Sequence, residues 1–464
     1  MVAPSRYLLA AVITATGALA SNKGSPVCIV GAGPAGLSAA KALEDKGRDV
    51  VIFEKQATVG GKSQAVYKDD WFLPLGAVLF NEDSYVETVK LVEQTGVPYR
   101  NFSAGERWTF DWKSDDAEVI PGATEDFEQA LVLEYLRYSE IWTTVYEPYS
   151  GIGYKNGVPA ELAVPGAQWL AENGFQVIGI PMIDAFTSYG YGDYREIPIL
   201  YMLQFFTPSI LGNYLGITSG YILDFHTLFV EYSKLIKGPI YLEAEIKSIN
   251  REKYPTISYR KKGSRRTYTQ KCSDLVLAFP PTIKALEAAN LDLTAEEEDL
   301  FGDVVVHNYF SSAVQMDQLP EDVSFWFEKP DPFTPVAPEG QPIYFQILHP
   351  GSGIASVYSW DRTDISPDPE KAKKLLIETL SKFNKDPRNA QQESVPVTEE
   401  DVLGWSGVVD YFPHLNTAAL EAGWYDRFNK IQGKSRTYFA SGLNGFEIVE
   451  FPLRAGKDIA ESYL

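Results

Sequence analysis

A glycine motif next to a predicted strand places the strongest constraint on this chain. The apolar run Val27–Val30 predicts a buried parallel strand, and three glycines follow it with the spacing G-x-G-x-x-G, at Gly31, Gly33 and Gly36. In this pattern the first glycine permits a tight turn and the second lets the backbone approach a pyrophosphate. The third lets the following helix pack closely on the strand. A lone motif of this kind is weak evidence for a dinucleotide site, so the inference depends on the flanking segments.

The flanking segments supply the context that a dinucleotide site requires. An alanine- and leucine-rich helix is predicted from Ala35 to Asp45, which places its free N–H groups beside the glycines. The second strand, Asp49–Phe53, ends at Glu54, whose carboxylate can accept hydrogen bonds from ribose hydroxyls, and Lys55 follows it. We therefore expect a Rossmann-type α/β domain that binds a dinucleotide. The acid at Glu54 disfavours the 2′-phosphate of NADP.

The next segment favours FAD over NAD. Gly60, Gly61 and Lys62 form a G-G-K loop after the acid, and Gly76-Ala77 follows in a second glycine-containing stretch. Here the sequence resembles the flavin-containing amine oxidase superfamily, in which the ribose acid is followed by a G-G-[RK] loop. The resemblance implies that the paired glycines contact the flavin diphosphate and that Lys62 compensates its charge. It places Gly76 and Ala77 beside the isoalloxazine. Lysine stands where most relatives carry arginine, so a planar bidentate fork is absent.

Three later blocks extend the resemblance over most of the chain. Ile240–Ile249 is a strand-like alternation, in which the backbone near Ile246 would pair with adenine. Cys272–Pro281 is similar to a family strand that ends in a turn beside the flavin. Thr437–Gly442 is a strand with a glycine turn, and a final helix is predicted over Glu450–Leu464.

The carboxyl-terminal block also departs from the family. Relatives carry an acid after the glycine of this turn, where it bonds the ribityl chain, but Leu443 follows Gly442 here. We expect the contact to be lost or to move to Glu447 or Glu450. This departure looks closer to the branch that holds fungal beta-cyclopiazonate dehydrogenase and bacterial polyunsaturated fatty acid isomerase. Because the block lacks cysteine, we expect non-covalent FAD, with a histidyl bond left open.

The order of these blocks predicts a discontinuous FAD-binding domain with an interleaved α+β substrate domain. The FAD-binding segments are 25–100, 235–303 and 404–464, and the substrate-domain segments are 101–234 and 304–403. Repeated prolines predict a surface loop over Pro320–Pro342. The predicted helices outside the FAD motifs are Glu125–Tyr146, Ile197–Phe206, Asp224–Ile236 and Glu370–Phe383.

Candidate catalytic residues follow from aromatic density and from the family pattern. Phe186–Tyr232 is dense in phenylalanine and tyrosine, which suits the wall of an apolar pocket, although ordinary core packing explains any single ring. Tyr191, between two glycines, is the best polar pocket candidate. Typical relatives use a lysine that orients water at the flavin N5. The matching strand, Val304–Met316, contains no lysine but holds His307, which could accept a proton or be a satisfied strand histidine. His226 and His414 carry the same two interpretations.

Composition limits the partners. Acidic residues outnumber basic ones by 62 to 41, and the net charge of -21 disfavours nucleic acids and anionic membranes. Four histidines and two cysteines leave little material for a metal site, so we expect no metal. We interpret Cys28 and Cys272 as buried thiols rather than as a bridge.

The amino terminus predicts a secretory route. Met1–Ala20 has a basic residue, then an apolar stretch, and then small residues at the positions a signal peptidase reads. The alternatives are a membrane anchor or a helix packed on the domain. Asn101-Phe102-Ser103 is a glycosylation sequon. We expect a secreted or lumenal glycoprotein without stable membrane insertion after cleavage.

Three functions remain open. The leading hypothesis is an FAD-dependent oxidoreductase that oxidises a C–N or C–C unit of a largely apolar or aromatic small molecule, with oxygen or another acceptor reoxidising the flavin. A specialised metabolite is a plausible substrate. The second is a redox-neutral isomerase that moves a double bond of an unsaturated acid. The third is a flavin- or ligand-binding protein without turnover, which the missing lysine and Leu443 keep open.

Overall fold

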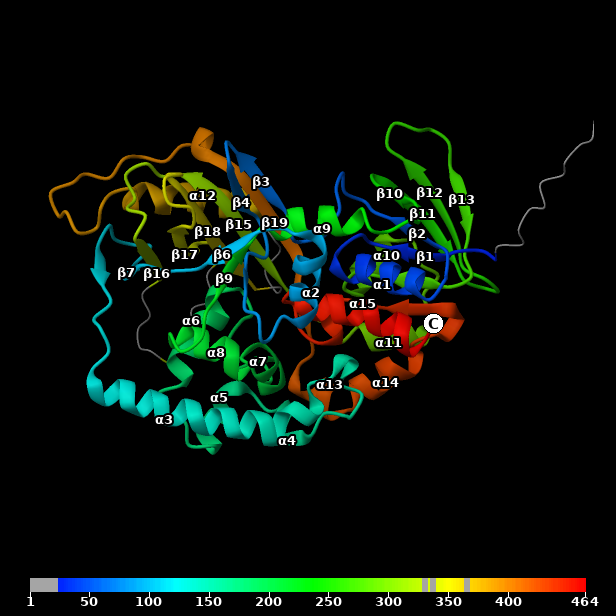
Figure 1. The fold of residues 1–464 in the computed structure, drawn as a ribbon, viewed down its shortest axis with the longest axis horizontal. Coiled ribbons are helices and arrows are strands. Elements are labelled where there is room, and N and C mark those ends of the chain that lie inside the picture. Colours follow the sequence, from blue (N-terminus) through cyan, green and yellow to red (C-terminus); the bar gives the residue numbers. More distant parts are fainter. Residues whose placement is uncertain (1–23, 328–332, 334–338, 363–367) are drawn as a thin grey trace, which may run out of the picture.

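The computed structural model of the protein describes residues 24–327, 333, 339–362 and 368–464. The predicted signal peptide, 1–20, lies outside these residues and stays a prediction. In Figure 1 the described chain forms two lobes, one around a parallel sheet and one around a larger mixed sheet, with helix α15 (Glu450–Ser462) beside the parallel sheet.

The first lobe is built on a five-stranded sheet with the order β10-β2-β1-β14-β20, in which every strand pair is parallel. Its three central strands, β2, β1 and β14, are buried along their whole length, as expected for a sheet that is covered on both faces. The five strands are β1 (Val27–Val30), β2 (Val50–Phe53), β10 (Ile240–Tyr241), β14 (Leu275–Leu277) and β20 (Thr437–Phe439).

Helix α1 (Pro34–Asp45) follows β1 as predicted and packs against α15 at the end of the chain. Gly456 makes this approach possible, because a Cβ there would lie 2.0 Å from the carbonyl oxygen of Ala35. The amino- and carboxyl-terminal ends of the described chain therefore meet in one lobe (Figure 1).

The predicted strand Ile240–Ile249 divides into two strands in different sheets. The backbone turns at Glu243, with φ of 50°, between β10 and β11 (Ala244–Asn250). Strand β11 then pairs antiparallel with β12 (Thr256–Lys261), which pairs with β13 (Tyr268–Lys271). The connection lets a chain that enters the parallel sheet leave it as a small antiparallel sheet.

The second lobe contains a seven-stranded sheet with the order β19-β15-β18-β17-β16-β7-β8, antiparallel except for the β16–β7 pair. Its strands are β7 (Glu106–Phe110), β8 (Ala117–Val119), β15 (Val305–Gln315), β16 (Val323–Phe327), β17 (Pro342–Ile347), β18 (Ile354–Asp361) and β19 (Val402–His414). Strand β19 pairs with β15 along most of its length. The predicted FAD-binding segment 404–464 begins within this strand, and the predicted domain bounds stay a prediction.

The stretch predicted as a loop, Pro320–Pro342, contains a strand. Residues Val323–Phe327 form β16, which pairs with both β17 and β7. The local proline content indicated a loop, but pairing with strands far away in sequence overrides it here. Residues 328–332 and 334–338 of this stretch lie outside the described part of the chain.

Helices and two small sheets complete the fold, with α3–α8 forming a layer beside the seven-stranded sheet in Figure 1. The helices are α2 (Val86–Thr95), α3 (Glu125–Ile141), α4 (Ala160–Ala163), α5 (Gly166–Glu172), α6 (Gly179–Ser188), α7 (Ile199–Phe205), α8 (Pro208–Tyr214), α9 (Phe225–Ser233), α10 (Ile283–Ala288), α11 (Ala295–Phe301), α12 (Pro369–Phe383), α13 (Thr417–Glu421) and α14 (Trp424–Ile431). The small sheets pair β3 (Ala65–Lys68) with β4 (Trp71–Pro74), and β5 (Leu79–Phe80) and β6 (Tyr99–Asn101) with β9 (Tyr221–Leu223). Among the described helices none is long and apolar enough to cross a bilayer.

The two cysteines form a disulfide, so their interpretation as thiols was wrong. Cys28 lies on β1 and Cys272 lies just before β14, with their Cα atoms 5.5 Å apart. The parallel pairing of β1 and β14 sets Cys28 opposite Leu275, so the chain that enters β14 passes Cys28. Strand pairing between segments 244 residues apart, which the sequence does not display, brings the two together.

Candidate functional site

The glycines of the predicted dinucleotide motif lie where backbone segments approach one another closely. Gly31 has φ of 105°, and a Cβ there would lie 2.7 Å from the carbonyl oxygen of Ala278. A Cβ on Gly36 would lie 1.9 Å from the carbonyl oxygen of Gly31. A Cβ on Gly61 would lie 3.0 Å from the Cα of Gly33, so the G-G-K loop rests on the first glycine turn. Two loops that were predicted separately therefore form one cradle.

The amino terminus of α1 is open to an anion. Gly33 is its N-cap, Pro34 is its first residue, and no side chain caps it. The first N–H groups of a helix lack intrahelical partners and favour a negatively charged group. Ala35 is buried in this first turn. An uncapped helix beside a glycine cradle fits the diphosphate of a dinucleotide.

Glu54 lies at the end of β2, as predicted, and its side chain is fixed by the backbone. One carboxylate oxygen accepts from the N–H of Ala32 at 2.6 Å and the other from the N–H of Gln56 at 2.7 Å. A carboxylate has about four lone-pair sites. Glu54 therefore keeps acceptor capacity for ribose hydroxyls, while its orientation is already set. Lys55 beside it is exposed.

The start of β11 lies next to this acid. The N–H of Ala244 donates to the carbonyl oxygen of Glu54 at 2.8 Å. Ile246, two residues further, is half-buried and precedes a bulge in the β11–β12 pairing. The backbone predicted to meet adenine is therefore adjacent to the residue predicted to meet ribose, and its contact with adenine stays a prediction.

Lys62 has a different set of partners from those expected. Its ammonium donates to the carboxylate of Glu447 at 2.7 Å and to the carbonyl oxygen of Asp410 at 2.6 Å. Burial alone would lower the pKa of Lys62, but the carboxylates of Asp410 and Glu447 raise it above its ordinary value. Burial raises the pKa of Glu447, in spite of Lys62. Lys62 is thus a charged anchor between the G-G-K loop, β19 and the segment before α15. Its predicted role toward the diphosphate stays untested.

The second glycine-containing stretch packs under this loop. A Cβ on Gly76 would lie 2.0 Å from the carbonyl oxygen of Lys62, so any larger residue would separate the two segments. Ala77 follows in a half-buried position. The hydroxyl of Ser311, on β15, donates to the carbonyl oxygen of Leu75 at 2.9 Å. This bond joins the stretch to the seven-stranded sheet and thereby brings the two lobes together.

Glu447 and Glu450, the two acids expected to replace the family acid that is absent at Leu443, lie in different surroundings. Glu447 lies at the glycine turn, since a Cβ on Gly442 would be 2.8 Å from its Oε2. Glu450 faces another element: its carboxylate accepts from the N–H groups of Glu87 and Thr88, at 3.0 and 3.1 Å, and from the Thr88 hydroxyl at 3.1 Å. It therefore caps the amino terminus of α2, whereas Glu447 lies at the glycine turn, and the ribityl contact expected of one of these acids stays a prediction.

Tyr191 lies in an aromatic cluster beside the Lys62–Glu447 pair. Its ring stacks on Tyr411 with centroids 5.7 Å apart and planes at 10°, and it meets Phe446 edge-on at 4.7 Å. Tyr411 also stacks on Tyr309, with ring centroids 4.4 Å apart. The Lys62 ammonium lies 5.7 Å from the centre of the Tyr411 ring. Burial raises the pKa of the Tyr191 phenol far above its ordinary value, so the group stays protonated and can donate a hydrogen bond. We name Tyr191, Tyr309, Tyr411 and Phe446 the aromatic cluster.

His307 is held from the turn that carries Tyr191. Its Nδ1 lies 2.9 Å from the carbonyl oxygen of Gly190, and the side chain is buried. Burial lowers the pKa of His307 to about 4, so the imidazole is neutral at pH 7. A neutral imidazole can accept a proton or a hydrogen bond at Nε2. Its role in catalysis stays a prediction.

The other two candidate histidines lie in different places. His414 is next to His307, with ring centroids 5.1 Å apart. His226 lies instead at the G-G-K loop, where its Nε2 is 3.5 Å from the Thr58 hydroxyl and its ring is 6.2 Å from that of Tyr67.

His226 therefore contacts the loop, whereas His307 and His414 lie together at one end of β15 and β19. The sequence alone does not distinguish these three histidines, whereas in the structure His226 lies apart from the other two.

Two residues of the site lie outside every sequence motif. Asp410 and Tyr411 are on β19, and they reach Lys62 because β19 is the edge strand next to β15. Glu447 and Phe446 follow the last glycine turn, where the sequence offered Glu447 as one of two alternatives. No local pattern marks β19 as part of the site, so sequence reasoning missed both of its residues.

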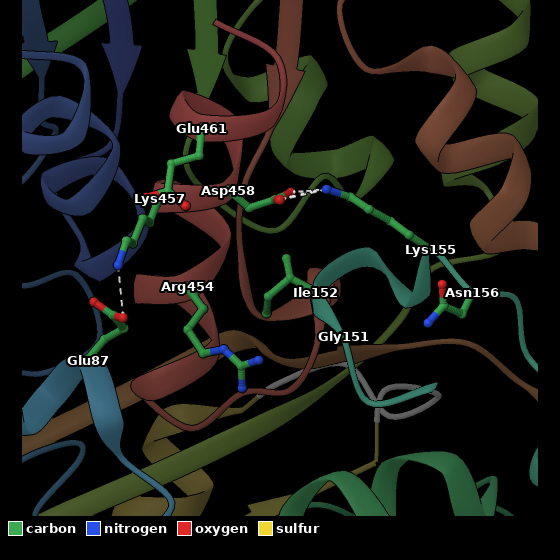
Figure 2. Close-up of a pocket in the computed structure, with 9 residues that line it drawn as sticks. All are labelled: Glu87, Gly151, Ile152, Lys155, Asn156, Arg454, Lys457, Asp458 and Glu461. Carbon is green, nitrogen blue, oxygen red and sulfur yellow. Dashed lines mark hydrogen bonds and ion pairs between the residues drawn. The ribbon is translucent and has the colours of Figure 1, made fainter. Parts of the chain in front are cut away.

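A separate hollow of about 350 Å³ lies between α15 and the segment 151–156. Figure 2 shows its two lysines already paired, Lys155 with Asp458 at 2.6 Å and Lys457 with Glu87 at 3.0 Å. It contains none of the residues predicted for the cofactor or for catalysis. We assign it no role in the site.

Comparisons with known proteins agree with this geometry. Residues 29–94 match the NAD(P)-binding Rossmann-like domain family. The chain is 22% identical to the FAD-dependent oxidoreductase oblC of Cochliobolus heterostrophus, over 89% of this chain and 85% of that one. It is 21% identical to the beta-cyclopiazonate dehydrogenase of Aspergillus flavus, over 89% of this chain and 87% of that one.

Solved structures share the fold. The fatty acid isomerase from P. acnes superposes with a TM-score of 0.79 and 21% identity, over 95% of this chain and 99% of that one. Putrescine oxidase bound to putrescine superposes with a TM-score of 0.63 and 13% identity, over 94% of this chain and 98% of that one.

These findings define the class of the protein. Its fold is the Rossmann-type α/β fold of flavin amine oxidases, and the resemblance predicted from the sequence is confirmed. The predicted cofactor, FAD, and the predicted enzyme class, an FAD-dependent oxidoreductase, are confirmed as well. The glycine cradle, the open end of α1 and the fixed Glu54 are the residues that would hold FAD.

Proposed function

We propose that the protein oxidises a C–N or C–C unit of a largely apolar small molecule, with FAD as the hydride acceptor and oxygen or another acceptor completing the cycle. The observation that carries this proposal is the position of the aromatic cluster. Lys62 of the Lys62–Glu447 pair lies over the ring of Tyr411, and Tyr191 contacts both Tyr411 and Phe446. Glu447 itself lies at the Gly442 turn. An apolar or aromatic substrate suits such walls.

The residues of this chain contribute position and exclusion of water. When bound, FAD supplies the hydride acceptor, and the protein places the reacting carbon against it. The stacked rings of Tyr191 and Tyr411 present apolar faces, while the Tyr191 phenol stays protonated and can orient a polar atom of the substrate. Neutral His307 offers a hydrogen-bond acceptor near the same turn.

Anaerobic mixing tests the proposal. FAD-loaded protein is mixed without oxygen with amines, indoles and unsaturated acids, and the flavin absorbance is followed. We expect one substrate class to bleach the flavin stoichiometrically, and air to restore the colour with release of hydrogen peroxide if oxygen is the acceptor. Replacing Tyr191 with alanine should slow the bleaching at least tenfold, and the same change at the half-exposed Tyr254 should leave it unaltered. Full FAD loading without bleaching by any of these compounds would contradict the proposal.

A redox-neutral double-bond isomerase is the second candidate, because the fatty acid isomerase shares the fold with a TM-score of 0.79. In that case an unsaturated acid changes its double-bond position, as seen by NMR, while the flavin shows no net bleaching. The same mixing experiment separates the two functions.

We also propose a secretory route. The amino-terminal segment predicts it, Asn101 of the sequon is exposed on β6, and the Cys28–Cys272 disulfide suits an oxidising compartment. Secreted protein should begin after residue 20 on amino-terminal sequencing and should lose mass with endoglycosidase unless Asn101 is replaced by glutamine. Cytosolic protein that begins at Met1 and carries reduced thiols would contradict this route.

A further inference from the structure

A hollow of about 230 Å³ opens beside the turn that carries Tyr191. It lies where β15, β18 and β19 approach the segment 192–198, and it is distinct from the hollow in Figure 2. The residues that bear on its chemistry are Gly192, His307, Trp360, Arg362, His414 and Asn416.

The two histidines present the same nitrogen in the same chemical form. The Nδ1 of His307 lies 2.9 Å from the carbonyl oxygen of Gly190, and the Nδ1 of His414 lies 2.7 Å from that of Phe412. Because a carbonyl oxygen only accepts, each Nδ1 must carry the proton. Each Nε2 is then a lone-pair acceptor, and neither makes a hydrogen bond to a described residue. Burial lowers the pKa of His307 to about 4 and that of His414 to about 3, which keeps both acceptors neutral at pH 7.

A donor completes the set. The indole Nε1 of Trp360 is buried and has no hydrogen-bond partner among the described residues. A buried polar group that lacks a partner has lost its hydrogen bonds to water without replacing them, which is unfavourable. The residues that line the hollow therefore include two with an unused acceptor and one with an unused, buried donor. Buried polar groups in proteins are normally hydrogen-bonded.

The charges of the lining disfavour an anion. Asp193 and Glu196 are both acidic, and the one basic residue among those that line the hollow, Arg362, lies 3.7 Å from the carboxylate of Glu196. An ionised carboxylate would also face the two imidazole lone pairs. A group that donates through O–H or N–H meets acceptors instead.

The hollow lies one ring away from the aromatic cluster. The ring of Phe412 is 5.9 Å from that of His307 and 5.2 Å from that of Tyr191. The same turn both carries Tyr191 and holds His307 through Gly190. Phe412 therefore packs both against His307, which lines the hollow, and against Tyr191 of the aromatic cluster.

We propose that this hollow binds a hydroxyl or amino group of the substrate, which donates to the Nε2 atoms of His307 and His414. This inference rests on the proposed function and names the polar end of its substrate. It restricts the substrate class to apolar molecules that carry an alcohol or an amine some distance from the bond that is oxidised.

The test uses the FAD-loaded protein labelled with ¹⁵N in histidine, and three probes of equal length: hexan-1-ol, hexylamine and hexanoate. We expect hexan-1-ol or hexylamine to shift the Nε2 signals of His307 and His414 but not those of His226. Hexanoate should bind at least tenfold more weakly. Tighter binding of hexanoate, or no change at either Nε2 with the alcohol and the amine, would overturn the proposal.

Two variants localise the binding. A Cβ on Gly192 would lie 2.6 Å from the Cε1 of His307, so Gly192→Ala should narrow the hollow and weaken probe binding at least tenfold. Trp360→Phe keeps a ring and removes the N–H, and it should weaken binding about fivefold, as expected for one hydrogen bond. Tyr254→Ala, at a half-exposed position outside the site, is the control and should bind the probes as the wild type does. Unchanged binding in both Gly192→Ala and Trp360→Phe would refute the site.

The outcome is independent of turnover. Probe binding is read from the histidine signals and requires no flavin reduction. Failure of the probes would refute this site and leave the oxidation open, whereas bound probes without bleaching by any substrate would refute the proposed oxidation alone.

Discussion

The region to which we assign the cofactor and the region to which we assign the substrate are built in different ways, and we call them the cofactor half and the substrate half of the site. The cofactor half uses glycines and backbone N–H groups from a short segment, Gly31 to Lys62, in which Cβ atoms would collide with neighbouring backbone. The substrate half uses large side chains, Tyr191, Tyr309, Tyr411 and Phe446, that come from four separate segments. A local backbone cradle tolerates almost no change in shape. A cluster assembled by sheet pairing can change its side chains while the fold persists.

The sharpest way to break this contrast is to add bulk to the cradle. Gly33→Val places a branched side chain over the turn, where even a Cβ would lie 3.6 Å from Gly61, so the protein should purify without FAD but folded. Absorbance and circular dichroism measure the two properties. Gly122→Val is the control, because nothing lies within 4 Å of a Cβ there. A yellow Gly33→Val protein would show that the diphosphate lies elsewhere.

The substrate half should respond to acid instead. The unfolded pKa of a histidine is 6.5, and that of His307 in the fold is about 4, so between these values the unfolded chain binds a proton that the fold does not. Stability is fully present above pH 6.5 and is lost as the pH falls to 4, by about 3 kcal/mol at ~1.4 kcal/mol for each tenfold change in proton affinity.

Urea unfolding from pH 4 to 7 measures this loss. His307→Gln should reduce the pH dependence, while the buried His414 and His349, whose pKa values are also lowered, still contribute to it. Parallel curves for the wild type and His307→Gln would contradict the neutral, buried state of His307.

The Lys62–Glu447 pair joins the two halves. Replacing Lys62 should lower the free energy of unfolding more than replacing Glu447. Lys62→Met leaves the buried carboxylate of Glu447 without its cation and should cost about 2–3 kcal/mol. This is less than for a fully buried pair, because the Lys62 side chain is 29% exposed. Glu447→Gln removes a carboxylate whose pKa is already raised, and it leaves Lys62 with Asp410, so it should cost under about 1 kcal/mol.

Chemical unfolding of both variants at neutral pH gives the comparison. Equal losses of unfolding free energy would show that the pair does not act as a charge anchor.

The last prediction concerns the ribose and is measured as FAD affinity. Glu54→Ala removes one charged acceptor and should raise the FAD dissociation constant about tenfold to a hundredfold, with the fold retained. The exposed Glu252→Ala is the control. Unchanged FAD affinity by fluorescence titration would remove Glu54 from the ribose role.

The contrast also explains what could be predicted from the sequence. The strand, glycine turn, helix and terminal acid of the cofactor half are contiguous, so their spacing alone predicts β1, α1 and β2 to within a residue. The strand Val305–Gln315 and the helix Pro369–Phe383 also follow from local pattern.

The remaining features depend on contacts that the sequence does not display. The disulfide, the strand β16 and the approach of Asp410 to Lys62 all require pairing between distant segments. The sequence also does not show that Glu450 accepts from N–H groups of α2. Motifs made of contiguous residues could be predicted from the sequence. The partners of buried charged residues could not, because they come from distant segments.

The most direct test of the whole account is a titration of the purified chain with FAD. The account predicts one FAD bound per chain, a flavin absorbance band that remains after gel filtration, and a rise in the unfolding temperature with FAD concentration. A folded protein that stays colourless and gains no thermal stability when FAD is added would contradict it.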